Sequence, residues 1–228
     1  MSNLLKLNNL SKKYEKNKSI KVLNNINFKF ESGKIYSIVG PSGSGKSTLL
    51  NLLSLIDSPS SGFIEFNHKK IDSYSSIRND KIRSKNIGII YQEKNLLPDF
   101  TALENVLLPN LLISNNKLKS KELAVKLIKE FNLKSRVDHY PSELSGGESQ
   151  RIAIARAIIN EPDIVLADEP TGSLDFNNAK QIFKILFNLK HKNRIIIFAT
   201  HNRYFANMAD CKIKMIDGKM GIINERIS

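Results

Sequence analysis

The sequence predicts an α/β fold with a mostly parallel sheet, an antiparallel β region at the N-terminus and a helical subdomain in the middle. Continuous apolar runs at residues 35–39, 164–167 and 195–198 are typical of strands that are buried on both faces of a parallel sheet. Helical patterns separate these runs, and strands that alternate with helices favour an α/β arrangement.

The N-terminal third predicts β structure. Ile26, Phe28 and Phe30 alternate with polar residues, which is the period of a half-buried strand. A turn at 31–34 then leads into the short apolar strand 35–39.

A largely buried helix is expected at residues 46–56, because apolar side chains recur there at helical spacing. The Ser, Pro and Gly cluster at 58–62 breaks this helix. Further along, a short apolar strand is expected at 87–91.

The central region predicts helices. Thr101 with Glu104 has the spacing of a capping box, and Ser145 with Glu148 repeats it at the start of a helix that extends to residue 159. Between these two starts, an apolar stripe is expected to face the core; it consists of Leu123, Leu127, Ile128 and Phe131.

We therefore expect a single domain, 1–228, built in two parts. A core of 1–92 and 160–228 carries the parallel sheet, and a helical subdomain of 93–159 is inserted into it. A chain of 228 residues is long enough for a sizeable core of this kind.

Composition restricts the location of the chain. No run of about 18 apolar residues is present, so no membrane-spanning helix is expected. The N-terminal residues 1–13 lack the apolar stretch of a signal peptide. A single cysteine, Cys211, cannot form an internal disulfide, which favours a reducing cytoplasm.

The chain is strongly basic, with a formal net charge of +13. Basic chains attract nucleic acids, nucleotides and anionic lipids. Here the lysines are scattered and not interleaved with aromatic residues, and no helix-turn-helix, zinc-finger or RNA-recognition pattern accompanies them. Nucleic acid is therefore not favoured as a partner, and a lysine-rich solvated surface is the simpler interpretation.

A phosphate loop follows the strand at 35–39 and opens the next helix. It has the pattern G-x-x-x-x-G-K-[ST], in which backbone N–H groups surround the phosphates and the helix N-terminus favours the same anion. Its residues are Gly40, Pro41, Ser42, Gly43, Ser44, Gly45, Lys46 and Ser47. We expect Lys46 to reach the β- and γ-phosphates, Ser47 to bind Mg²⁺ and Thr48 to contact the α-phosphate. No Asn-Lys-x-Asp motif is present, which argues against a GTPase.

Two acidic residues follow the apolar run at 164–167. Because successive strand residues point in opposite directions, Asp168 and Glu169 can take different roles. Asp168 can face Mg²⁺ through water, and Glu169 can face the water that attacks the γ-phosphate. One polarising carboxylate suffices, since phosphoryl transfer depends mainly on positioning and charge neutralisation.

A second anion site is predicted at Ser145, Gly146 and Gly147. Each glycine in a helix costs roughly 1 kcal/mol relative to alanine, so two of them in a first turn are a poor choice for capping alone. They are suitable where an anion approaches the bare backbone. Because the chain already has a phosphate loop, ATP held between two copies of the chain explains both sites.

Four more residues gain meaning only in combination with these motifs. Gln92 follows a strand and can sense Mg²⁺ and the attacking water, and His201 can donate to the γ-phosphate. Tyr14 can stack on adenine. Asp175 can cap the helix that extends to residue 187, or lie across a dimer interface.

The order of these motifs resembles that of the ABC-transporter ATPases over essentially the whole chain. The matching segments are the Walker A motif at 40–47, the Q-loop at Gln92, the signature at 144–148, the Walker B motif at 164–169, the D-loop at 173–175 and the H-loop at His201. The resemblance implies the P-loop NTPase fold, ATP and Mg²⁺ as cofactors, and a homodimer that sandwiches ATP. It also places Tyr14 at adenine and Glu169 as general base, and implies integral-membrane permease subunits that contact the substrate.

A narrower resemblance rests mainly on residues 96–106. This segment is similar to the one after the Q-loop in ATP-binding subunits of lipoprotein-releasing systems, and 141–143 and 167–172 look like that subfamily too. The resemblance implies a peripheral subunit on the cytoplasmic face of a bacterial inner membrane that powers lipoprotein release.

Two alternatives to lipoprotein release stay open. One is the ATPase of a macrolide or antimicrobial-peptide exporter, or of a cell-division complex, whose catalytic residues are shared. The other is a soluble ABC ATPase that acts on nucleic acid or ribosomes. The second is less favoured, because the chain has neither a long coiled-coil insertion nor a second cassette.

Overall fold

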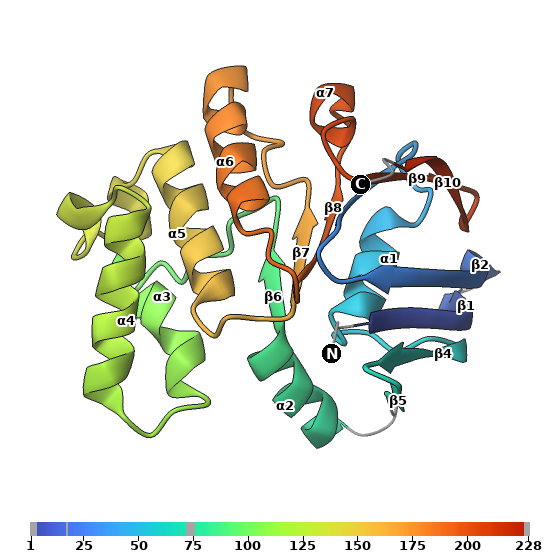
Figure 1. Cartoon of the computed structure of the whole chain (residues 1–228), viewed down its shortest axis with the longest axis horizontal. Helices are drawn as coiled ribbons and strands as arrows, with labels where there is room; N and C mark the ends of the chain where they lie inside the picture. The colour runs from blue at the N-terminus through green and yellow to red at the C-terminus, as the bar shows by residue number, and fades with distance from the viewer. Residues whose placement is uncertain (1–3, 17, 72–75, 226–228) are drawn as a thin grey trace.

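The computed structural model describes residues 4–16, 18–71 and 76–225, and its strands form two sheets (Figure 1). The smaller sheet is antiparallel, with the order β2-β1-β4-β5. Its strands are β1 (Leu4–Lys16), β2 (Lys18–Glu31), β4 (Ser61–Phe66) and β5 (Lys69–Lys70). The antiparallel N-terminal region predicted from the alternation around Ile26 is thus confirmed.

The larger sheet has the order β10-β9-β3-β8-β7-β6, and only β10 runs antiparallel to its neighbour. Its strands are β3 (Ile35–Val39), β6 (Ile87–Ile90), β7 (Ile164–Asp168), β8 (Ile195–Ala199), β9 (Cys211–Ile216) and β10 (Lys219–Glu225). The predicted apolar strands correspond to β3, β6, β7 and β8 to within one residue, because a continuous apolar run is needed where both faces are covered.

The α-helices of the described ranges are α1 (Lys46–Leu53), α2 (Ser76–Asn86), α3 (Ala102–Leu111), α4 (Lys117–Glu130), α5 (Gly146–Ile158), α6 (Phe176–Asn188) and α7 (Arg203–Ala206). Among them, α1, α5 and α6 pack on the faces of the larger sheet. Along β7, Leu166 packs in the same apolar cluster as α1, whereas Val165 packs with α5 and α6. Alternate strand residues therefore place α1 on one face of the sheet and α5 and α6 on the other.

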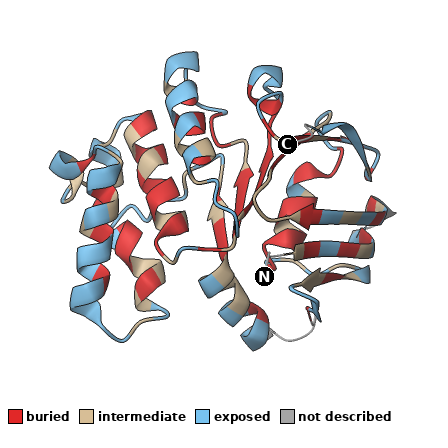
Figure 2. Cartoon of the chain, viewed as in Figure 1, coloured by how far each residue is buried: buried red, intermediate tan, exposed pale blue. Residues whose placement is uncertain are grey.

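A third apolar cluster joins α3, α4 and α5, on the left in Figure 1. Asn105 on α3 is fully buried there, and its side chain bonds the backbone of Leu97, Phe100 and Thr101. Figure 2 shows buried residues along the strands of the large sheet and along the inner sides of α1 and α5. None of the helices in the described ranges combines the length and apolar character needed to cross a bilayer.

Two details of the predicted helices are wrong. The helix expected to reach residue 56 ends at Leu53, because Leu55 takes a left-handed conformation (φ 59°) that a helix cannot continue through. On α4, Leu123 is 38% exposed, while the helix buries the face that holds Ser120, Ala124 and Ile128. Leu123 lies about 100° around the helix from Ala124 and so at the edge of that face.

Both predicted capping boxes are confirmed. The Thr101 backbone N–H donates to Glu104 (2.8 Å), and the Ser145 backbone N–H donates to Glu148 (2.8 Å). In return, each hydroxyl accepts from the backbone N–H of its glutamate. These bonds satisfy N–H groups that a helix start otherwise leaves free, and so fix where α3 and α5 begin.

Candidate functional site

The candidate residues follow four neighbouring parallel strands. The phosphate loop follows β3, Gln92 follows β6, Glu169 follows β7 and His201 follows β8. Because the carboxyl ends of parallel strands lie at the same edge of a sheet, the topology brings these residues to one edge.

Two glycines of the phosphate loop are needed for its shape. Gly45, the residue before α1, has φ 102°, which side chains rarely adopt. A Cβ on Gly40 would lie 2.2 Å from the carbonyl oxygen of Met215 on β9. The loop therefore fits between β9 and α1 only with glycine at both positions.

Lys46 is buried and folds back over the loop. Its Nζ donates to the carbonyl oxygens of Gly40 (2.9 Å) and Pro41 (3.0 Å). None of the ion pairs among the described residues includes Lys46, so its charge has no carboxylate partner there. A buried cation without a counterion is costly, and a bound anion removes that cost. The Ser44 hydroxyl is likewise buried with no hydrogen-bond partner among the described residues.

Glu169 is held in an unusual conformation. Its φ is 43°, and its backbone N–H donates to Ala199 at the end of β8 (3.1 Å). Left-handed backbone in a residue other than glycine, asparagine or aspartate is uncommon and often marks a functional site. Burial raises the pKa of the Glu169 carboxyl above its ordinary value.

His201 lies over this carboxylate. Its Nε2 is 3.3 Å from Glu169 Oε1, and its side chain is 57% exposed. Glu169 Oε1 is itself buried and accepts no hydrogen bond from the described residues. The structure therefore brings the predicted site residues His201 and Glu169 together. It also leaves Glu169 Oε1 as a hydrogen-bond acceptor at the carboxyl edge of the sheet.

Gln92 lies against the loop that follows Glu169. A Cβ on Gly172 would be 3.0 Å from Gln92 Nε2, and the Gly172 backbone N–H donates to Glu169 O (3.0 Å). The amide is thus close to the Walker B segment, although 92 and 172 are far apart in sequence.

The sequence predicts Ser47, Gln92 and Asp168 as the donor set for a metal. A hydroxyl, an amide oxygen and one carboxylate are ligands of the kind that Mg²⁺ takes when it also keeps water and substrate phosphates. Within the described ranges, no group of three or more His, Cys, Asp or Glu side chains is placed to hold a metal. The residues present therefore fit Mg²⁺ that arrives with a nucleotide.

The signature glycines have a packing role within the chain. A Cβ on Gly147 would lie 3.2 Å from Asn178 Oδ1 on α6, and one on Gly146 would lie 3.3 Å from Leu174 Cδ2. Close packing near the start of α6 is therefore one reason for glycine at positions 146 and 147. The approach of an anion, predicted from the sequence, is another.

Asp175 is the N-cap of α6. Its Oδ1 accepts from the backbone N–H groups of Asn177 and Asn178 at 3.0 Å each. Hydrogen bonds from Asn178, backbone and side chain, lower the pKa of the Asp175 carboxyl. Of the two expectations for this residue, the helix cap is confirmed.

Asp57 and Lys12 are two residues that sequence reasoning missed. The Tyr14 hydroxyl donates to Asp57 Oδ2 (2.8 Å), and Lys12 Nζ binds Asp57 Oδ1 (2.5 Å). Lys12 Nζ also lies 4.8 Å from the centre of the Tyr14 ring, and the Tyr14 hydroxyl interacts with Thr48. These contacts fix the tyrosine beside the first turn of α1. No sequence signal links Asp57 to Tyr14, because the pair forms only when β1 meets the turn after α1.

Arg156 and Gln150 on the signature helix were also missed. Arg156 donates to the carbonyl oxygens of Lys94 (2.9 Å) and Asn95 (2.7 Å), and Gln150 donates to that of Tyr91 (3.4 Å). The segment that carries Gln92 is therefore attached to α5 on both sides of Gln92. Because Gln150 and Arg156 occupy ordinary polar positions of the helix, the sequence alone does not predict these contacts.

Glu148 stabilises the signature turn through a hydrogen bond to the backbone and an ion pair. The Ser145 backbone N–H and the Arg136 guanidinium (2.8 Å) lower the pKa of Glu148 to about 2. A lowered pKa stabilises the folded state above the ordinary value of 4.5, and this stability is lost as pH falls toward 2. Glu148→Gln removes the negative charge that Ser145 and Arg136 stabilise. We therefore expect the free energy of unfolding at pH 7 to fall by about 1 kcal/mol, a modest loss because solvent screens part of the Glu148–Arg136 ion pair.

The measurement for Glu148 is urea unfolding at a series of pH values. The variant is expected to lose less stability than the wild type between pH 4.5 and 2. Glu143→Gln is the matched control, since Glu143 accepts one backbone N–H from Tyr140 in a similar turn. Equal acid sensitivity of wild type and Glu148→Gln would contradict the assignment.

Comparison with known proteins agrees with this geometry. The family model described as ABC transporter matches residues 23–172. Two relatives carry the name lipoprotein-releasing system ATP-binding protein LolD. The one from Wigglesworthia glossinidia brevipalpis is 47% identical, covering 95% of this chain and 96% of the relative. The one from Cytophaga hutchinsonii is 41% identical, covering 96% and 99%.

Solved structures give the same result. The ATP-binding cassette MJ0796, in a dimeric post-hydrolysis state bound to ADP and Pi, superposes with a TM-score of 0.88 at 34% identity over 96% of this chain and 99% of that one. The cbiO1 protein of Clostridium perfringens, part of an ABC transporter complex, superposes with a TM-score of 0.84 at 28% identity, over 97% of this chain and 88% of that one. The chain therefore belongs to the ABC transporter family and is an ATP-binding cassette that hydrolyses ATP.

Proposed function

We propose that two copies of the chain bind two ATP molecules head to tail, each phosphate loop facing the signature of the other copy. The observation that carries this proposal is the position of the two anion sites. The phosphate loop leads into α1 on one face of the large sheet, whereas Ser145 caps α5 on the other face. In Figure 1, β7, β8 and α6 lie between α1 and α5. Because the two anion sites of one chain lie on opposite faces of the sheet, they do not enclose the same phosphate. The signature of a second copy can instead face the phosphate loop of the first.

Within this sandwich, each site residue has a proposed role. Tyr14 stacks on adenine, Thr48 contacts the α-phosphate, and Lys46 leaves its two carbonyl acceptors to reach the β- and γ-phosphates. The backbone N–H groups of residues 40–47 surround the phosphates. Ser145, Gly146 and Gly147 of the partner copy hold the γ-phosphate, and Asp175 lies at the interface beside them.

Hydrolysis requires a water aligned with the γ-phosphorus. We assign its polarisation to the Glu169 carboxylate, which accepts a hydrogen bond and then the proton as the water oxygen attacks. The bond between the γ-phosphorus and the bridging oxygen breaks, and ADP and phosphate are the products. His201 and Gln92 position the γ-phosphate and the water. Ser47, Gln92 and Asp168 would hold Mg²⁺, and the bound ion would supply positive charge that neutralises the phosphate oxygens.

Movement follows from the attachment of the Q-loop segment to the signature helix. The helical subdomain of 93–159 is proposed to move as a unit against the core of 1–92 and 160–228. Arg156 and Gln150 tie α5 to the residues around Gln92. A change at Gln92 on ATP binding therefore pulls on α5 and on the signature of the same chain.

The transport step rests on the full-length similarity to relatives of 47% and 41% identity whose names state lipoprotein release. By that similarity, the dimer binds integral-membrane permease subunits at the cytoplasmic face of a bacterial inner membrane and powers release of lipoproteins from it. Substrate contacts then belong to the permease and not to this chain.

Affinity purification from detergent-solubilised membranes tests this proposal. The Glu169→Gln variant with ATP is used, since blocked hydrolysis is expected to hold the closed dimer. Co-purification of one or two membrane proteins with bound lipoproteins is the expected result. A peptide-export or cell-division partner would overturn lipoprotein release but keep the motor, and ribosomes or nucleic acid without a membrane protein would overturn the transport role.

A further inference from the structure

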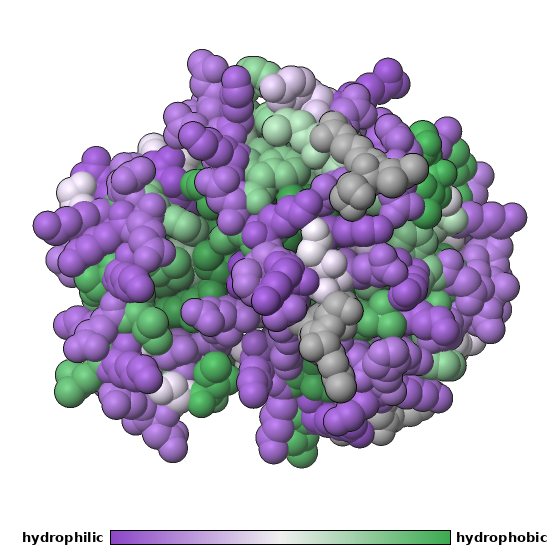
Figure 3. All heavy atoms as spheres, viewed as in Figure 1, coloured by the Kyte–Doolittle hydropathy of each residue, from purple (hydrophilic) through white to green (hydrophobic). Residues whose placement is uncertain are grey.

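Tyr14 and Ile20 are the exposed large hydrophobic side chains of the antiparallel sheet within the described ranges, at 39% and 61%. They are direct partners in the pairing of β1 with β2, so their side chains lie next to each other on one face. Figure 3 shows mainly hydrophilic side chains on the side of the molecule where Figure 1 places these strands. A tyrosine ring beside an isoleucine offers a flat apolar surface on which a base can stack.

Asp57, in the turn after α1, fixes the orientation of the Tyr14 ring. The Tyr14 hydroxyl donates to Asp57 Oδ2 (2.8 Å), and Lys12 Nζ donates to Asp57 Oδ1 (2.5 Å). Lys12 Nζ also lies over the Tyr14 ring, 4.8 Å from its centre, which limits movement of the ring. One carboxylate thus holds two side chains of β1 against the end of α1.

The bond between Tyr14 and Asp57 persists at neutral pH. Burial would raise the pKa of the Asp57 carboxyl, but hydrogen bonds from Lys12 and Tyr14 outweigh burial and lower this pKa below its ordinary value. Burial and the hydrogen bond to Asp57 raise the pKa of the Tyr14 hydroxyl. The carboxylate is therefore ionised and the hydroxyl protonated, and a hydrogen bond to a charged acceptor is stronger than one between neutral groups.

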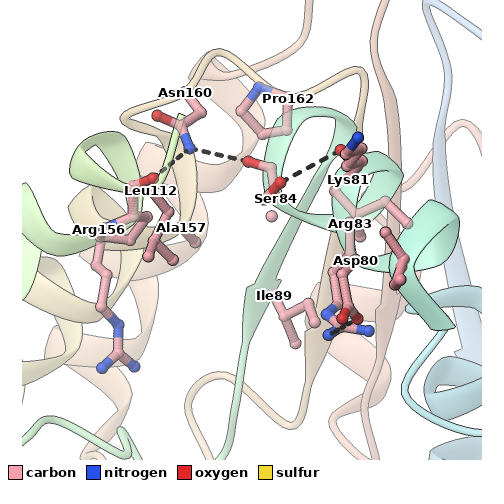
Figure 4. Close-up of a pocket in the computed structure, with 14 residues that line it drawn as sticks. Asp80, Lys81, Arg83, Ser84, Ile89, Leu112, Arg156, Ala157, Asn160 and Pro162 are labelled. Atoms are coloured by element: carbon pink, nitrogen blue, oxygen red, sulfur yellow. Dashed lines mark hydrogen bonds and ion pairs between the residues drawn. The ribbon is translucent and has the colours of Figure 1, made fainter. Parts of the chain in front are cut away.

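The turn that carries Asp57 is held by two neighbouring elements. Figure 4 shows Arg83 on α2 beside a neighbouring cavity, and its guanidinium donates to the carbonyl oxygen of Leu55 (3.0 Å). On the β1 side, the Ser60 backbone N–H donates to the carbonyl oxygen of Ser11 (2.9 Å). The fold therefore places the Asp57 carboxylate where the tyrosine hydroxyl can reach it.

We propose that Asp57 is a positioning residue for nucleotide binding, which holds the Tyr14 ring in the orientation that stacks on the base before the nucleotide arrives. The inference rests on the proposed stacking of Tyr14 on adenine. A side chain that is ordered in advance loses little conformational freedom on binding, so more of the stacking energy contributes to affinity. Asp57 acts through Tyr14 and is not itself a nucleotide contact.

The effect of Asp57 is confined to the base. Its hydrogen-bond partners are Lys12, Tyr14 and the backbone N–H of Ser58 (2.7 Å), and none of these belongs to the phosphate loop. The Tyr14 hydroxyl also interacts with Thr48 in the first turn of α1, which places the ring beside the loop. Loss of Asp57 should therefore raise KM for ATP and leave kcat unchanged.

Steady-state ATPase kinetics and calorimetric titration of the full-length chain test this inference. The two probes are ATP and inorganic tripolyphosphate, which occupies the phosphate loop but has no base. Asp57→Ala is expected to weaken ATP binding roughly 3- to 10-fold, because the ring must then be ordered on binding. Its kcat and its affinity for tripolyphosphate should equal those of the wild type.

Two further variants show whether Asp57 acts through the tyrosine. Tyr14→Phe keeps the ring and removes the hydroxyl, so it should lose as much ATP affinity as Asp57→Ala. The double variant should lose no more than either single one, because both changes break the same bond. Asp57→Asn keeps an acceptor for the hydroxyl and should recover most of the affinity. Should Asp57→Ala prove unfolded, Tyr14→Phe carries the test, since it leaves the ion pair with Lys12 intact.

Asp210→Ala is the matched control. The side chain of Asp210 is 27% exposed and that of Asp57 is 28%. Asp210 also pairs with a lysine, Lys190 (2.8 Å), and accepts from a neutral donor, the Ile35 backbone N–H (2.7 Å). Because it lies at the end of β3 opposite the phosphate loop, its loss should not change ATP affinity. Melting temperatures of all variants are recorded alongside.

Tyr14→Ala separates this inference from the proposed stacking, and should weaken ATP binding roughly 10- to 100-fold. If this variant binds ATP like the wild type, the stacking is wrong and the inference fails with it. If it binds weakly while Asp57→Ala and Tyr14→Phe bind normally, the stacking stands and Asp57 is not a positioning residue. Equal loss of ATP and tripolyphosphate affinity in Asp57→Ala, or the same loss in Asp210→Ala, would show a merely structural role and overturn the inference.

Discussion

Replacing Glu169 by glutamine is expected to lower ATP turnover by roughly 100- to 10,000-fold while ATP binding persists. The glutamine side chain keeps the shape and the hydrogen-bonding capacity of the site but cannot accept a proton from water. Single-turnover hydrolysis measures the effect, and light scattering with ATP shows whether the dimer persists. Normal hydrolysis in the variant would show that another group polarises the water.

The pH dependence gives this assignment an independent test. Burial raises the pKa of Glu169, so the carboxylate becomes protonated at a higher pH than that of an ordinary glutamate, whose pKa is 4.5. Turnover of the wild type should therefore fall on the acid side at a pH above that value. The residual activity of Glu169→Gln should lack this acid limb, because the variant has no carboxyl to titrate.

Stability separates lost catalysis from lost folding. Because the pKa of Glu169 is raised in the folded state, the ionised carboxylate destabilises the folded protein. The protonated carboxyl contributes favourably to the free energy of unfolding below the pKa of the unfolded state, and this contribution is lost as the pH rises through the folded-state pKa. Glu169→Gln should thus unfold at the same or a higher temperature than the wild type at pH 7. Glu130→Gln, the same change on the exposed end of α4, is the control and should alter neither rate nor stability noticeably.

Replacing Lys46 by alanine should weaken ATP binding by roughly 100-fold or more. Hydrogen bonds from a charged group contribute about 1.5–3 kcal/mol each, and the lysine is expected to make at least one to the β- or γ-phosphate. Calorimetric titration with ATP measures the loss. AMP, which lacks those phosphates, should bind both forms with similar affinity.

Lys184→Ala is the control for this change, because Lys184 is exposed on α6 and remote from the phosphate loop. Lys46→Ala also loses the two bonds to Gly40 and Pro41, so its melting temperature must be recorded alongside. If a folded Lys46→Ala protein keeps full ATP affinity, the phosphate-loop assignment is wrong.

Elements marked by a strong local signal were predictable. Strands β3, β7 and β8 are continuous apolar runs, and such runs fit only a sheet that is covered on both faces. Helices α3 and α5 begin where a hydroxyl and a glutamate three residues later satisfy each other's N–H groups. The sequence motifs likewise located the phosphate loop, Asp168, Glu169 and the signature segment along the chain.

Elements without such a signal were missed or misplaced. Helix α2 has only Ile77 and Ile82 as apolar residues, which gives no periodicity to detect. Leu123 matched the spacing of the α4 stripe, but the packing of α4 on α3 and α5 chose a face centred on Ala124. The end of α1 was set by the backbone of Leu55, which local propensity does not reveal.

The amino-acid sequence alone identified the nucleotide loop and the acid pair after β7 and predicted a second anion site at 145–147, because each depends on a few adjacent residues with fixed chemistry. The distant residues that support these segments are evident only in the folded chain. Tyr14 meets Asp57, Gln92 meets Gly172 and Arg156 holds the backbone at 94–95. These contacts join segments 43 to 80 positions apart, and no local pattern encodes the strand order that brings them together.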